Sequence, residues 1–139
     1  MSEFRHLTVP IALPALEVAA FAGNPANLPQ WAAGLASGIR SEGGRWLASS
    51  PMGDVEVRFV GDVAAGILDH EVTLPSGEKA LNQFRILDDG AHSLAIFHLR
   101  RSPGVSQEVF EADAAAVQQD LETLRQVLEQ GDGKISERS

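Results

Sequence analysis

One long amphipathic helix in the last third of the chain constrains the fold more than any other feature. Its apolar side chains recur in steps of four and three residues, which places them on one face of a helix of about six turns. They are Phe110, Ala114, Val117, Leu121, Leu124 and Leu128. Ser106 is a suitable N-cap, and Gly131 and Gly133 predict the end of the helix, so residues 131–139 are expected to form a disordered tail. A helix with a single apolar stripe must bury it against another layer.

A change of periodicity predicts that this other layer is a sheet. Between residues 36 and 100, apolar and polar side chains alternate with a period of two, which is typical of strands. Six strands are expected, over Ala36–Ser41, Arg45–Ser50, Asp54–Val60, Gly66–Leu74, Lys79–Leu87 and Ser93–Arg100. The segments between them, such as Pro75-Ser76-Gly77 and Asp88-Asp89-Gly90, have turn composition. Such short connections join antiparallel neighbours, so we expect an antiparallel meander.

The chain before residue 36 is expected to supply one more strand and two short helices. Arg5–Ile11 alternates like a strand, and Leu16–Ala22 has a helical pattern. Asn27–Gly34 is a second helical run, with Asn27 as N-cap. The predicted fold class is therefore α+β, with a curved antiparallel sheet of about seven strands wrapping the long C-terminal helix. A curved sheet and one helix do not fill the space between them, and small-molecule sites form in such spaces.

Length and composition favour a single domain, which we place at residues 1–130. The chain has 139 residues, of which 44% are hydrophobic and 22% are charged, as in ordinary globular proteins. Its net charge of −8 argues against nucleic acid as a partner, because that partner requires a positive surface. No signal peptide and no apolar run long enough for membrane insertion are visible. The absence of cysteine suits a cytoplasmic location and removes thiol chemistry.

Three segments near the start of the chain carry a resemblance to a known superfamily: His6–Pro14, Glu17–Phe21 and Asn24–Trp31. They follow the pattern of a strand, a proline, a valine-x-x-phenylalanine helix, and then asparagine-proline before leucine-proline-x-tryptophan. With the terminal helix, they make the chain similar to the START-like, birch-pollen-allergen-like helix-grip (SRPBCC) superfamily, and within it to the polyketide cyclase/dehydrase-like group. The resemblance covers residues 4–130 and implies the helix-grip fold. It does not imply one function, because members include enzymes, lipid and hormone carriers and chaperone-associated proteins.

Alternation along the strands predicts which side chains face the space under the helix. The expected ligand-binding residues are Trp31, Trp46, Phe59, His70, Asn82, Phe84 and His98. The strand over residues 93–100 is apolar on both faces, so the inward position of His98 is one of two alternatives. His70 and Asp113 are the candidates for catalysis, since histidine can exchange a proton near neutral pH. The alternative for His70 is a buried, hydrogen-bonded residue of the core.

Three functions stay open at this point. The first is binding of a small hydrophobic or aromatic molecule in an internal cavity. The second is a cyclase/dehydratase-type enzyme of the polyketide cyclase-like group, in which His70 or Asp113 moves a proton. The third is a chaperone-associated interaction module that works through the exterior of the sheet. The sequence predicts no cofactor and no metal site, because no compact His/Asp spacing is present, and it leaves a homodimer open.

Overall fold

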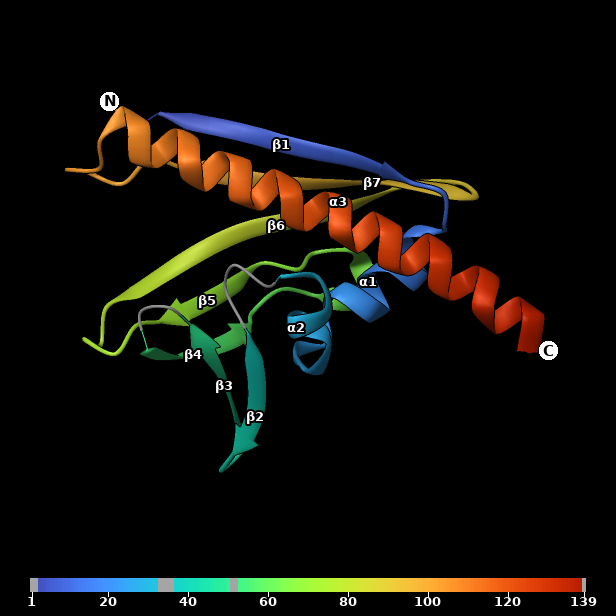
Figure 1. The fold of residues 1–139 in the computed structure, drawn as a ribbon, viewed down its shortest axis with the longest axis horizontal. Coiled ribbons are helices and arrows are strands. Elements are labelled where there is room, and N and C mark those ends of the chain that lie inside the picture. Colours follow the sequence, from blue (N-terminus) through green and yellow to red (C-terminus); the bar gives the residue numbers. More distant parts are fainter. Residues whose placement is uncertain (1–2, 33–36, 51–52, 139) are drawn as a thin grey trace.

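The computed structural model describes residues 3–32, 37–50 and 53–138, with side chains through Gln130. Its main layer is a seven-stranded antiparallel sheet in the order β1-β7-β6-β5-β4-β3-β2 (Figure 1). The strands are β1 (Phe4–Ile11), β2 (Gly38–Glu42), β3 (Arg45–Ser50), β4 (Gly53–Phe59), β5 (His70–Thr73), β6 (Lys79–Asp89) and β7 (His92–Arg100). The helical elements are α1 (Ala15–Ala22), η1 (Pro25–Asn27), α2 (Leu28–Trp31), η2 (Val63–Ala65) and α3 (Gln107–Arg138).

The predicted order of one strand, two short helices, six strands and a long helix is confirmed. Asn27 occupies the N-cap position of α2, but its side chain does not cap the helix. It donates instead to the Phe21 carbonyl at 3.1 Å, which ties α2 back to α1. Residues 33–36, on which the predicted end of the second helix and the start of the next strand fall, lie outside the described residues.

β6 joins two parts of the sheet and bends between them. Its residues 79–82 pair with β5, and its residues 83–89 pair with β7. The strand predicted over Gly66–Leu74 is shorter than expected, since β5 begins only at His70. Gly66 has a φ of 82°, and a Cβ at this position would collide with the Ile86 carbonyl oxygen. The chain therefore meets β6 here in a left-handed turn that requires glycine, and the sheet curves (Figure 1).

α3 lies along β1, at one edge of the sheet, and not across its middle (Figure 1). Its apolar stripe is buried as predicted, apart from Val117, which is half-buried. The inner face of β1 supplies the partners Leu7, Val9 and Ile11, all of them buried. Because the helix covers the β1 side, it leaves the strands farther along the sheet less covered.

α3 continues beyond its predicted end. Its backbone is helical through Arg138, so the prediction that Gly131 and Gly133 end the helix is wrong, and residues 131–138 extend it. A glycine costs about 1 kcal/mol of helix propensity relative to alanine, but it keeps the N–H that the hydrogen-bond ladder needs. The domain boundary at residue 130 stays a prediction. Over the described ranges, we find no helix with both the length and the apolarity that crossing a membrane requires.

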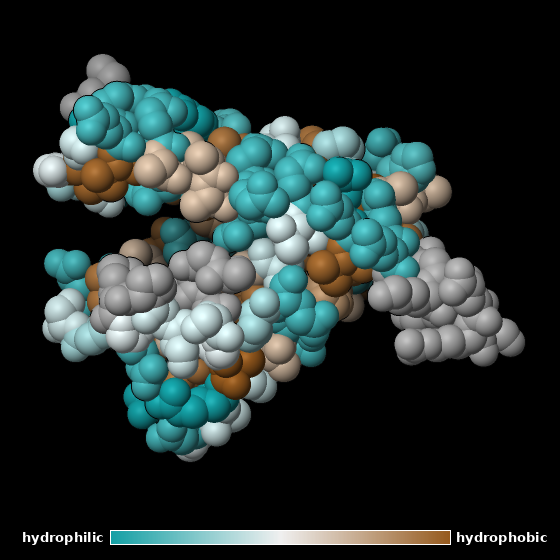
Figure 2. Space-filling view, viewed as in Figure 1, coloured by the Kyte–Doolittle hydropathy of each residue, from teal (hydrophilic) through white to brown (hydrophobic). Residues whose placement is uncertain are grey.

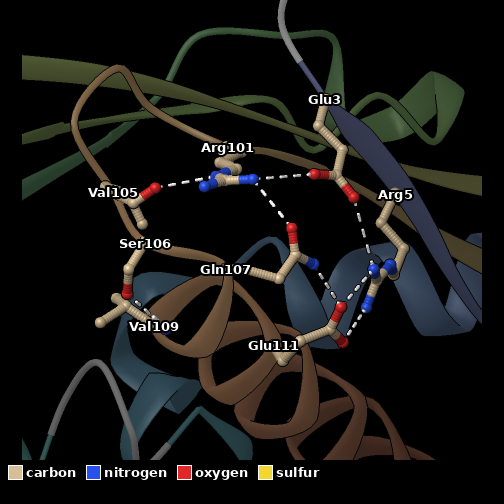
Figure 3. Close-up of polar contacts among 8 residues, drawn as sticks. All are labelled: Glu3, Arg5, Arg101, Val105, Ser106, Gln107, Val109 and Glu111. Atoms are coloured by element: carbon tan, nitrogen blue, oxygen red, sulfur yellow. Dashed lines mark hydrogen bonds and ion pairs between the residues drawn. The ribbon is translucent and has the colours of Figure 1, made fainter.

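A network of polar contacts holds the first turns of α3 on β1 and on the end of β7 (Figure 3). The Arg5 guanidinium makes two hydrogen bonds to the Glu111 carboxylate, the longer of them 2.8 Å, and lies 4.9 Å from the centroid of the Phe110 ring. Gln107 donates to Glu111 at 2.7 Å and accepts from Arg101 at 2.8 Å.

Arg101 extends this network to the end of β7 and to the start of α3. Its guanidinium also donates to Glu3 and to the Val105 carbonyl. The Ser106 hydroxyl accepts from the Val109 N–H, which confirms the predicted cap.

Replacing Glu111 with glutamine is expected to weaken this attachment in a pH-dependent way. The hydrogen bonds from Arg5 and Gln107 lower the pKa of Glu111 from 4.5 to about 2. Such a carboxylate stabilises the fold above its unfolded pKa, and its contribution is lost as the pH falls toward the folded pKa. Glu111→Gln should therefore unfold at a lower urea concentration than the wild type at neutral pH, and the difference should vanish between about pH 4.5 and about pH 2. Urea unfolding at several pH values measures this.

Glu108→Gln provides the matched control, because Glu108 lies in the first turn of α3, three residues before Glu111, is exposed and is outside the network. Equal shifts for the two variants, or a shift for Glu111→Gln that does not depend on pH, would contradict the role assigned to the network.

Candidate functional site

A cavity of about 260 Å³ lies between α3, α2 and the curved part of the sheet. Figure 2 shows a hollow in the surface on the left of the view, below the N-terminal half of α3. The lining residues are Leu28, Trp31, Ala32, Phe59, His70, Asn82, Phe84, Phe97, Leu99, Asp113, Ala116, Val117, Asp120 and Leu121. Six residues named from the sequence are therefore brought together here: Trp31, Phe59, His70, Asn82, Phe84 and Asp113. That they bind a ligand stays a prediction.

Aromatic rings form the wall of the cavity on the side of the sheet. The centroid of the Phe84 ring lies 5.7 Å from that of Trp31 and 5.8 Å from that of Phe97. The His70 ring lies 5.4 Å from Phe59 and 6.3 Å from Phe97. These neighbouring rings run from α2 across the sheet to β4. Such a wall offers a large apolar area and stacking contacts to a planar molecule.

The pairing of three strands explains why these side chains share one face. Phe59 lies opposite His70, and His70 lies opposite Asn82. Directly opposed residues of antiparallel strands point to the same side, so the three side chains form one row across the sheet. Asn82 is the last residue of β6 that pairs with β5, so the row lies at the bend, where the sheet and α3 diverge.

His70 is a buried, neutral imidazole with one nitrogen already engaged. It is 7% exposed, and its Nδ1 lies 3.0 Å from the Leu68 carbonyl oxygen. A carbonyl can only accept, so Nδ1 carries the proton and Nε2 is left as an acceptor. Burial in apolar surroundings lowers the pKa of His70 below its ordinary value of 6.5, despite the opposing effects of the Leu68 carbonyl and of Asp69.

The residue next to His70 belongs to the opposite face. Asp69 accepts a hydrogen bond from the Phe84 backbone N–H at 3.1 Å and two from the Arg85 guanidinium at 3.0 and 2.8 Å. These bonds from Arg85 lower the pKa of Asp69, so its carboxyl is ionised. Asp69 therefore ties the start of β5 to β6 and fixes the position of His70, while Arg85 is held outside the cavity.

Trp31 presents a buried polar group without a partner. The residue is 6% exposed, and its indole Nε1–H meets no acceptor within the part of the chain that the structure describes. A buried donor that is left unpaired costs about 1–3 kcal/mol, and nearly all such groups in folded proteins are paired. The Nε1 atom is itself covered by its neighbours, so an acceptor on a bound molecule would reach it only when these side chains move.

α3 contributes two carboxylates to the lining. Asp113 and Asp120 are seven residues apart, so they lie two turns apart on the same side of the helix. Asp113 is exposed and has no hydrogen bond or ion pair to any described residue, whereas Asp120 is half-buried and does have a partner. No lysine or arginine is among the residues found to line the cavity in the described ranges. Asp120 is not among the site residues predicted from the sequence. Its spacing of seven residues from Asp113 could have identified it, because that spacing places both side chains on the same side of the helix.

His98 does not line the cavity. On β7, Ser93 and Ala95 are buried and Phe97 and Leu99 face the cavity, so that His98 is on the outer face, with its ring 4.4 Å from that of His6. The alternative that placed His98 inward is therefore wrong. The buried inner face of β7 carries the small side chains Ser93 and Ala95, and α1 packs against β6 and β7.

Trp46 also lies away from the cavity. It pairs with Val57, on the same face of the sheet as Ala48, but near the end of β3 that adjoins the turn at Gly43 and Gly44. There it lines a separate surface depression together with Pro25. The prediction that Trp46 lines the same pocket as Trp31 is therefore wrong.

No group of three or more potential metal ligands is found within residues 3–32, 37–50 and 53–130. The polar side chains that line the cavity are the Trp31 indole, the His70 imidazole, the Asn82 amide and the two carboxylates of α3.

No protein-family model matches the chain, and no curated protein matches it either. Several solved structures do match its fold. A START superfamily protein from Mycobacterium smegmatis has a TM-score of 0.61 and 15% identity over 91% of this chain and 97% of its own. Zhui aromatase/cyclase from a Streptomyces species has a TM-score of 0.63 and 15% identity, over 93% of this chain and 94% of its own. For the di-domain ARO/CYC BexL they are 0.68 and 18%, over 91% of this chain and 46% of that one.

The chain has the helix-grip fold of START-like proteins. The helix-grip fold expected from the resemblance is therefore confirmed. At identities of 15–18% the likeness extends to architecture alone. The ligand and the reaction have to be argued from the cavity itself.

The burial of His70 predicts a loss of stability on mild acidification. Because its pKa is lowered in the folded state, the unfolded chain binds a proton more readily, and the free energy of unfolding falls as the pH drops below about 6.5. The loss amounts to about 1.4 kcal/mol for each unit by which folding lowers the pKa. His70→Asn keeps a donor for the Leu68 carbonyl and cannot titrate, so its unfolding free energy should vary less between pH 7 and about pH 5. Urea unfolding monitored by circular dichroism measures both slopes.

His92→Asn removes a histidine from an exposed position at the start of β7 and serves as the control. If His70→Asn and the control had the same pH dependence as the wild type, the acid sensitivity would not come from His70.

Proposed function

We propose that this chain binds a small, largely aromatic molecule in the cavity under α3. The cavity of about 260 Å³ falls just below the range of roughly 300–1,000 Å³ that is usual for ligand pockets, so the ligand is small. Its lining is mostly apolar and aromatic, with a few polar groups, which is the composition that such pockets share. Asp113 and Ala116 are both lining residues and exposed, so the cavity is open to solvent.

The observation that carries this proposal is the unpartnered indole of Trp31. Trp31 is 6% exposed, and its Nε1–H has no partner among the described residues. If the core were filled by its own side chains, this unpaired donor would only destabilise the fold. In a binding site the same group favours a ligand with an acceptor, which would satisfy Nε1–H once the side chains that cover it move. The Nε2 atom of His70 complements it as an acceptor for a donor on the ligand.

A cyclase/dehydratase-type enzyme is the second candidate. Two observations favour it: an imidazole nitrogen free to accept a proton in an apolar cavity, and the carboxylate of Asp113 on the same lining. In that case His70 acts as general base and the cavity walls fold the substrate. The chaperone-associated alternative would use the outer face of the sheet. It stays a prediction, as do the cytoplasmic location and the homodimer.

A cavity-filling variant tests the binding proposal. Ala116→Phe adds a ring to a residue that lines the cavity, whereas Ala115→Phe adds the same ring to an exposed neighbour outside it. Titration with 2-naphthylmethanol, a neutral aromatic probe, should give an affinity at least about tenfold lower for Ala116→Phe than for the wild type. Ala115→Phe should bind like the wild type. Isothermal calorimetry measures the affinities, and circular dichroism checks that both variants fold.

The Trp31 indole provides a direct readout in the same experiment. The chain has two tryptophans, so Trp46→Phe leaves a single indole N–H signal in a proton–nitrogen correlation spectrum. That signal should shift downfield as the probe saturates the site, because Nε1–H gains an acceptor. An unmoved indole signal together with equal affinities for the two alanine variants would contradict the proposal. Independently of these titrations, native mass spectrometry of the freshly purified protein would identify the chemical class of any natural ligand that stays bound.

A further inference from the structure

The charges on the cavity lining point to the chemical class of the ligand. We infer that the cavity selects a cationic aromatic ligand over an anionic one, with the carboxylate of Asp113 as counter-ion to an ammonium group. This inference rests on the proposed binding function and adds the charge of the ligand to it. It is carried by the sign of the charged lining residues, by the solvent access of Asp113 and by the aromatic wall opposite α3.

An anionic ligand would find no counter-charge in the described lining. The ionisable groups there are the two carboxylates of α3 and the imidazole of His70, which is neutral at physiological pH because burial lowers its pKa. A buried carboxylate or phosphate needs hydrogen-bonded positive partners, which arginine usually provides. Two arginines that neighbour lining residues along their strands are engaged in ion pairs, since Arg85 pairs with Asp69 at 2.8 Å and Arg58 with Glu71 at 3.3 Å.

A cationic ligand meets favourable partners on both sides. Asp113 has no hydrogen bond or ion pair to any described residue, so its carboxylate can pair with an ammonium group without first breaking another contact. The rings of Phe59, Phe84 and Phe97 line the opposite side of the cavity and can stack on the aromatic part of the ligand. The net charge of −8 also favours the approach of a positive molecule.

The polar atoms of the sheet side restrict the ligand further. The Nε1–H of Trp31 requires an acceptor, and Nε2 of His70 accepts from a donor. The ligand class that fits the whole lining is therefore an aromatic amine that also carries a hydroxyl or carbonyl oxygen. The aromatic ring of the ligand stacks on the aromatic wall, and its ammonium group pairs with Asp113 on α3, where the cavity is open to solvent.

Three probes that share a naphthalene ring and differ in charge test the inference: 2-naphthylmethylamine, 2-naphthylmethanol and 2-naphthoate. At neutral pH they are cationic, neutral and anionic. With the wild type, we expect the amine to bind at least about tenfold more tightly than the carboxylate, with the alcohol between them. In Asp113→Asn the ratio of amine to carboxylate affinity should fall severalfold. Asp88→Asn makes the same change of net charge at the exposed end of β6, outside the cavity, and its ratio should stay that of the wild type.

The outcomes separate this inference from the proposed function. Suppose that the alcohol binds but the carboxylate and the amine bind with equal affinity, or that Asp113→Asn leaves the ratio of amine to carboxylate affinity unchanged. The selection for cations is then wrong, and the binding function stands. If none of the three probes binds, the binding function itself fails. Raising the salt concentration provides a measurement on the unaltered chain. The ratio should shrink with added salt, because Asp113 is exposed and its field is screened, and a ratio independent of salt would overturn the assignment.

Discussion

The position of α3 over β1 determines where the chain has a core and where it has a cavity. The stripe that includes Leu121, Leu124 and Leu128 faces the first strand, and its burial favours this helix rotation by roughly 1.5–3 kcal/mol for each leucine. The neighbouring stripe then faces the middle of the sheet by helical geometry alone. That second stripe carries Asp113, Ala116, Val117 and Asp120, which are too short or too polar to fill the gap. The core and the cavity are two adjoining faces of one helix.

The bend of β6 is the complementary constraint on the side of the sheet. A flat sheet would come close to α3 along its whole width, and side chains as large as Phe84 and Phe97 would then leave no room for another molecule. The left-handed turn at Gly66 and the change of partner strand after Asn82 direct the two parts of the sheet apart. The Arg5–Glu111 contact keeps the first turns of α3 on β1 while the sheet curves away below them. The same bend places His70 and Asn82 in the cavity, so the curvature that makes the space also supplies its polar groups.

The sequence predicts the strands and helices well because their signals are local. Alternation with turn glycines defines the hairpins, and a three–four repeat defines α3. It also predicts the inward faces of β4, β5 and β6, where one parity is clearly apolar. It fails for His98, because both faces of β7 are apolar and only tertiary packing, which buries Ser93 and Ala95, decides between them. It fails for Trp46, because parity gives the face of a strand but not the position along it. The bond from Nδ1 of His70 to Leu68 and the unpartnered indole of Trp31 depend on long-range geometry, so no local pattern reveals them.

The state of His70 bears on the choice between a binding protein and an enzyme. A general base must become an imidazolium during the reaction, and the burial that lowers the pKa of His70 opposes this charge. Its Nδ1 proton is already donated to a carbonyl, which stabilises the cation only in part, and the carboxylate of Asp69 is directed to Arg85 on the other face. A neutral imidazole that accepts a hydrogen bond needs no such charge. His70 as found here is therefore better suited to holding a ligand donor than to removing a proton, and an enzymatic role would require the substrate or Asp113 to stabilise the imidazolium.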